Sequence, residues 1–81
     1  MSDYQIAFEL HYQGNKIHVN RHFMGTQAIF RILFPDKRTP LVITRAKNAN
    51  ASKFWTSIPE GRQSEAEEIG ALISEYFNSI A

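Results

Sequence analysis

Histidine and carboxylate side chains near the start of the chain are the residues whose types and spacing could support chemistry. The chain has 3 His, and apolar residues recur at every second position in 4–12 and 16–23, a pattern typical of two paired strands. In the expected pairing, His11 lies directly opposite His18, with Glu9 close by. Opposed residues of an antiparallel pair have Cβ atoms about 4.5–5.5 Å apart, so the two imidazoles could share one metal ion. The same residues would also suit a solvated sheet face, and both interpretations stay open.

The expected pairing follows from a two-residue turn at Gly14 and Asn15. Such a turn makes Gln13 face Lys16, and it places the large apolar residues of both strands on one side of the hairpin. A third strand continues this side. The apolar residues that the three strands place on this side are predicted to form the buried face: Ile6, Phe8, Leu10, Val19, Phe30 and Ile32.

Three further β segments and one helix follow the hairpin. Alternation and β-branched residues predict strands at 28–34, 41–46 and 53–58, and a period of 3.6 predicts a helix at 64–79. Strands followed by one helix define an α+β fold: an antiparallel sheet of four to five strands in meander order, with the C-terminal helix packed on one face. We expect residues 1–81 to form a single domain.

Two features of the helix sequence carry local predictions. Ser64 with Glu67 three residues later fits a capping box at the start of the helix. Gly70 costs about 1 kcal/mol relative to alanine in the middle of a helix. Its presence there predicts a close approach of the helix to the sheet.

Composition excludes several classes of protein. With 43% hydrophobic and 21% charged residues the 81-residue chain is an ordinary globular one, and with 0 Cys it has no disulfide, thiolate nucleophile or cysteine-based metal site. It has no signal-peptide pattern and no apolar stretch of about 18–20 residues. We therefore expect a soluble, cytoplasmic protein that does not enter the membrane.

The net charge of +1 hides a segregation of charge along the chain. All 9 Lys and Arg lie at or before Arg62, and half of the 8 acidic residues follow it. A basic body of this kind favours binding to a polyanion such as single-stranded nucleic acid. The candidate residues for that alternative function are Lys37, Arg38, Arg45, Lys47 and Arg62.

One helix can cover only one face of the sheet, which leaves the other face for interaction. The residues expected on this uncovered interaction face are His11, His18, Ile29, Arg31, Leu33 and Trp55. A mixture of apolar and polar side chains is typical of a binding surface. The first hypothesis is a non-enzymatic interaction domain without a cofactor, homodimeric through this face or through an edge strand, with any other protein partner unknown. Nucleic-acid binding and metal binding at His11 and His18 are the alternatives.

The C-terminal half also carries a resemblance. The run FWTSIPEGRQ at 54–63 and the segment EAEEIG at 65–70 resemble the C-terminal half of small bacterial proteins of unknown function. This resemblance implies a bacterial origin, and it implies no catalytic or ligand-binding residues.

Overall fold

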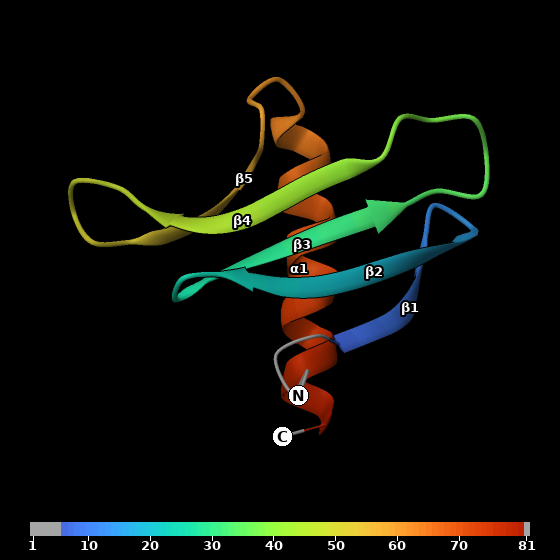
Figure 1. Ribbon diagram of the computed structural model, residues 1–81, viewed down its shortest axis with the longest axis horizontal. Coiled ribbons are helices and arrows are strands. Elements are labelled where there is room, and N and C mark those ends of the chain that lie inside the picture. The colour runs from blue at the N-terminus through green and yellow to red at the C-terminus, as the bar shows by residue number, and fades with distance from the viewer. Residues whose placement is uncertain (1–5, 81) are drawn as a thin grey trace.

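The strands of the sheet follow one another in the same order as in the chain. The computed structural model describes residues 6–80. Its elements are β1 (Ile6–Tyr12), β2 (Asn15–Met24), β3 (Gln27–Leu33), β4 (Leu41–Lys47), β5 (Lys53–Ser57) and α1 (Gln63–Ile80). Neighbouring strands are antiparallel in the order β1-β2-β3-β4-β5, and α1 crosses behind the sheet in Figure 1. The predicted α+β meander with one C-terminal helix is confirmed.

The turn between β1 and β2 lies one residue earlier than predicted. Gln13 and Gly14 both have positive φ, 53° and 80°, as a turn of type I′ requires of its two central residues. The turn therefore occupies 13–14, because glycine fits its second central position, and Tyr12 faces Asn15. The predicted start of the first strand at Tyr4 lies outside the described residues.

This turn shifts the partner of every β1 residue by two positions. His11 faces Lys16, and Glu9 faces His18. The predicted direct opposition of His11 and His18 is wrong. Because the side-chain period of a strand is two, the shift leaves each residue on the face where it was expected.

The predicted apolar side of the sheet is the side that α1 covers. Its central residues Ile17, Ile32 and Ile43 are fully buried, and so is Ile69 of the helix. The Phe8 ring of β1 stacks on Tyr76 with centroids 4.0 Å apart. Further buried members of this core are Val19, Phe30, Leu41, Ala66 and Ile73.

Trp55 belongs to this covered side, which corrects its place on the predicted interaction face. It pairs with Arg45, and its ring meets Phe30 edge to face with centroids 5.4 Å apart. A Cβ atom added at Gly70 would overlap Cγ of Trp55. The predicted close approach at Gly70 is therefore confirmed, and the indole of Trp55 is what fills the space.

The start of α1 is held differently from the predicted capping box. The helix begins at Gln63, so Ser64 lies inside its first turn. The backbone N–H of Arg62 donates to Oγ of Ser57 at 3.1 Å, and Oε2 of Glu67 accepts from Nε2 of Gln63 at 3.0 Å. Within 6–80, no helix combines the length and apolar character needed to cross a bilayer.

Replacing Gly70 by alanine should destabilise the fold, although a change from glycine to alanine usually stabilises a helix. The added methyl group would overlap the indole of Trp55, and overpacking of this kind costs about 2–3 kcal/mol. Urea denaturation of G70A should show this loss. In a Trp55→Leu background, the same change should be neutral or stabilising by up to about 1 kcal/mol. A G70A protein more stable than the parent would contradict the contact.

Candidate functional site

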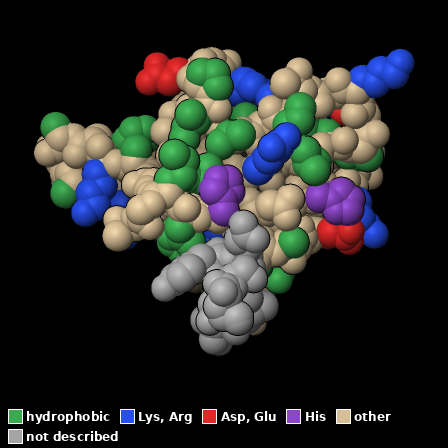
Figure 2. Space-filling view, in the orientation of Figure 1, with side chains coloured by type: hydrophobic (Ala, Val, Ile, Leu, Met, Phe, Trp, Pro, Cys, Tyr) green, Lys and Arg blue, Asp and Glu red, His purple; other side chains and the backbone are tan. Residues whose placement is uncertain are grey.

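The face of the sheet turned away from α1, here called the open face, carries apolar side chains that water reaches. Figure 2 shows this face, with hydrophobic side chains gathered over the sheet around single basic and histidine side chains. Leu33, Phe54 and Ile58 are 36%, 39% and 45% exposed. Strand alternation places Leu33 and Phe54 on this face, together with Met24. Ile58 follows the end of β5. Sequence reasoning missed Phe54, whose place depends on the pairing of β5 with β4.

The predicted members of the interaction face differ in how much surface they offer. Ile29 lies on the open face between His22 and Thr44, but it is only 5% exposed. It therefore adds little to a contact surface, contrary to expectation. Arg31 is exposed and paired in register with Val42. Arg31 and Leu33 thus lie on the open face as predicted.

Glu9 organises the β1 end of the open face. Its carboxylate lies 3.1 Å from Nδ1 of His18 and 3.5 Å from Nζ of Lys16. These side chains are about half exposed, so each contact contributes roughly 0–1 kcal/mol. His11 is exposed beside them. Among the described residues no group of three or more His, Cys, Asp or Glu side chains could hold a metal ion.

The sheet has two edge strands, and they differ in protection. At the β5 edge, the carbonyl of Trp55 accepts a hydrogen bond from Nε2 of Gln63 at 2.6 Å. β5 has 5 residues and is followed by Pro59. β1 has 7 residues without proline or lysine. Beyond its pairing with β2, its backbone makes no hydrogen bond to another described segment.

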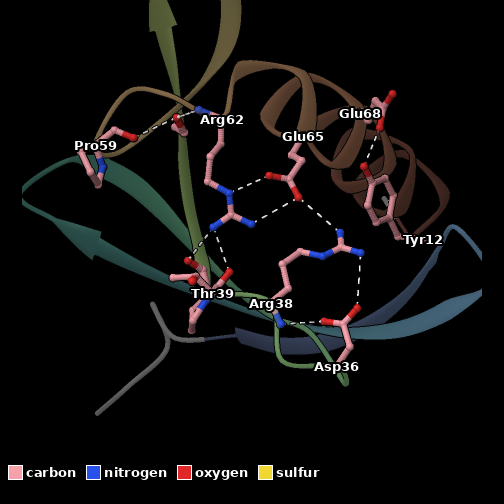
Figure 3. Close-up of polar contacts among 10 residues, drawn as sticks. Tyr12, Asp36, Arg38, Thr39, Pro59, Arg62, Glu65 and Glu68 are labelled. Atoms are coloured by element: carbon pink, nitrogen blue, oxygen red, sulfur yellow. Dashed lines mark hydrogen bonds and ion pairs between the residues drawn. The ribbon is translucent and has the colours of Figure 1, made fainter.

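A cluster of ion pairs lies between the sheet and the start of α1 (Figure 3). Glu65 accepts from Nε of Arg62 at 2.6 Å and from Nη1 of Arg38 at 3.3 Å. Arg62 also donates from Nη1 to the carbonyls of Thr39 and Pro40 at 2.9 and 3.0 Å. The Arg62 guanidinium holds the pKa of the Glu65 carboxyl below its usual range. The ionised Glu65 carboxyl therefore stabilises the fold above the pKa that it has in the unfolded chain. This stabilisation is lost as the pH falls through its lower pKa in the folded protein.

A second contact joins the first hairpin to the helix. The Tyr12 hydroxyl donates to Oε1 of Glu68 at 2.5 Å (Figure 3). Burial, followed by this hydrogen bond, raises the pKa of Tyr12 from 10.0 to about 12. The neutral phenol is therefore the form that fits the folded protein.

The basic residues predicted to bind anions fall into separate groups. Arg38 and Arg62 already share Glu65, and Lys37 is exposed in the loop beside them. Arg45 and Lys47 line a shallow hollow with Lys53 at the other end of the sheet. The structure therefore does not bring these residues together into one basic surface.

Comparisons with known proteins add no relative. No protein-family model, curated protein or solved structure matches the chain. The arrangement of its side chains is therefore the basis for any functional assignment.

The free energy of unfolding should fall as the pH rises from about 10 to about 12. The phenol of Tyr12 ionises near pH 10.0 in the unfolded chain and near pH 12 in the folded protein. The contribution of Tyr12 to stability is therefore fully present below pH 10.0. The loss over this range is about 2–3 kcal/mol. Urea denaturation at several alkaline pH values would measure it. Tyr12→Phe should remove this part of the fall, whereas Tyr76→Phe should keep it, and an equal fall in Tyr12→Phe would contradict the assignment.

Proposed function

We propose that the protein is a small non-enzymatic interaction domain that forms a homodimer through the outer edge of β1. The observation that carries the proposal is the contrast between the two edges of the sheet. An edge strand without proline, lysine, bulge or cover is a template for pairing with another strand. Within the part of the chain that the structure describes, β1 meets this description along 7 residues, while Gln63 blocks the edge of β5. The bacterial, cytoplasmic setting expected from the sequence belongs to the same proposal.

Rigidity and apolar surface at β1 support pairing. The stacked rings of Phe8 and Tyr76 fix the strand against the helix, so little order has to be gained on association. Ile6 and Leu10 lie beside the edge on the helix side and are only partly buried. A second copy would cover more of both side chains, which favours association at about 25 cal/mol per Å² of apolar surface.

Charge selects the register of the pairing. A two-fold axis perpendicular to the sheet keeps side chains on their faces, so the axis passes midway between the two copies of one β1 residue, which then face each other. An axis at Glu9 would oppose two carboxylates, which is unfavourable. An axis at Leu10 places Glu9 opposite His11 of the second copy, and does so twice. We therefore propose the register centred on Leu10.

The open face is less suited to symmetric self-association. Arg31 lies within it, exposed, with no ion pair to a described residue. Stacking two identical open faces would bring two such arginines into one apolar contact, where unpaired charge is costly. Leu33 on this face therefore serves as a control position.

A charge exchange at β1 tests the register. The variant His11→Glu should weaken self-association by at least about tenfold, because it places carboxylates opposite each other twice. Glu9→Lys should also weaken it, because it removes the carboxylate that faces His11 of the second copy. A mixture of the two variants should restore the dimer. In the mixed dimer the introduced lysine of one copy faces the introduced glutamate of the other, and the unchanged His11 faces the unchanged Glu9. Sedimentation of each variant and of the mixture at micromolar concentration measures this.

Two controls decide between the surfaces. Leu33→Glu should leave the dimer unchanged, and circular dichroism should show that every variant is folded. Loss of the dimer in Leu33→Glu alone would assign the interface to the open face. A parent protein that sediments as a monomer at all concentrations would overturn the proposal.

A further inference from the structure

A groove opens between the sheet and the C-terminal half of α1. The β2–β3 and β4–β5 hairpins reach past the helix in Figure 1. The space measures about 350 Å³, within the range of about 300–1,000 Å³ that is typical of small-molecule sites. Its lining residues come from four strands and the helix: Arg21, Ala28, Phe30, Arg45, Trp55 and Phe77, with Thr26, Gln27, Ile73, Ser74 and Asn78.

Two arginines face this groove, and none of the described residues that line it is acidic. Nε of Arg21 is buried and makes no hydrogen bond to a described residue. Its guanidinium carbon lies 5.2 Å from the ring centroids of both Phe23 and Phe77. The two rings attract the guanidinium through cation–π contacts, but they offer no hydrogen-bond acceptor to its N–H groups.

Arg45 approaches the groove from β4. Its guanidinium carbon lies 5.2 Å from the Trp55 ring centroid, and Nη2 donates to Oγ of Ser74 at 3.1 Å. Arg21 and Arg45 are two strands apart, about 10 Å between backbones, with β3 between them. The short side chain of Ala28 pairs with Phe23 on one side and leaves the space between the two arginines open.

The contrast with the other covered arginines shows what this groove lacks. Arg38 and Arg62, on the same side of the sheet, are neutralised by Glu65 within the chain. Arg21 and Arg45 have no such carboxylate among the described residues. The end of α1 adds roughly half a negative charge, which does not balance two full positive charges.

We propose that this groove binds a small organic anion in which a carboxylate or phosphate group is attached to a flat ring. The forked N–H groups of arginine match the two oxygens of such an anion. Phe30, Trp55 and Phe77 provide walls for the ring. The site is separate from the β1 edge, so it stands whether or not the protein dimerises.

Titration with benzoate, phenyl phosphate, inorganic phosphate and neutral benzamide tests the ligand class. The sequence contains 1 Trp. This residue, Trp55, lines the groove, so its fluorescence reports ligand binding, and changes in amide chemical shifts show where the ligand binds. One ring anion should bind saturably with a Kd near or below about 1 mM. Benzamide and inorganic phosphate should bind at least about tenfold more weakly. The tighter of benzoate and phenyl phosphate identifies the acidic group.

Matched arginine variants test the site itself. Arg21→Met and Arg45→Met should each weaken binding by about tenfold or more, whereas Arg31→Met on the open face should change it less than twofold. Ala28→Leu should weaken binding by filling the groove without changing charge. Arg21→Met should unfold at the same or a higher temperature, because it removes a buried donor that has no acceptor. A merely structural Arg21 would instead lower that temperature.

Three results would overturn the proposal. The first is the absence of a saturable response to either ring anion up to about 10 mM. The second is equal binding of benzamide and benzoate. The third is equal loss of binding in Arg31→Met and Arg21→Met.

Discussion

The contact between Gly70 and Trp55 sets the position of the helix, and the remaining features of the molecule depend on that position. Because Gly70 has no side chain, α1 lies directly on the indole of Trp55, close to the β5 side of the sheet. The acidic start of α1 then meets the β3–β4 loop, where Glu65 reaches Arg38 and Arg62. At its other end, Tyr76 stacks on Phe8 of β1. One helix thereby closes the core across all five strands, but it leaves the tips of two hairpins without cover.

The segregation of charge along the sequence has a spatial counterpart. The acidic residues of α1 lie mostly in its first half, and two of them bind other side chains of the protein: Glu65 lies between two arginines, and Glu68 accepts a hydrogen bond from the Tyr12 hydroxyl. Positive charge is therefore neutralised at one end of the layer between helix and sheet. The other end of that layer holds Arg21 and Arg45, and no carboxylate of residues 6–80 lines it with them. A chain with a net charge of +1 can in this way contain a groove lined by two arginines.

Local sequence patterns predicted the elements and faces of this fold, whereas pairing across strands decided the details that were missed. Alternation placed Phe8, Val19 and Ile32 on the covered side correctly, because it depends only on the period of a strand. The register of the first hairpin depended on which residue takes the second turn position, and Gly14 took it. Trp55 was expected on the wrong face, because the five residues of β5 do not fix which of its side chains face the helix; its pairing with β4 does. Glu65 pairs with Arg62 at i,i+3 spacing within the sequence, but its second partner, Arg38, lies in a segment far apart in sequence, and no local pattern encodes that pair.

The two proposed binding regions occupy different parts of the same layer, which makes them compatible. β1 contributes no residue to the groove lined by Arg21 and Arg45. Pairing two β1 strands about a perpendicular two-fold axis would place both helices on one side of a continuous sheet. Each groove lies on the helix side, beneath the hairpins farther along the sheet, and would stay open to solvent in the dimer. Such a dimer would present two equivalent anion sites on one surface, while its opposite surface would combine two open faces with their exposed Leu33 and Phe54 side chains.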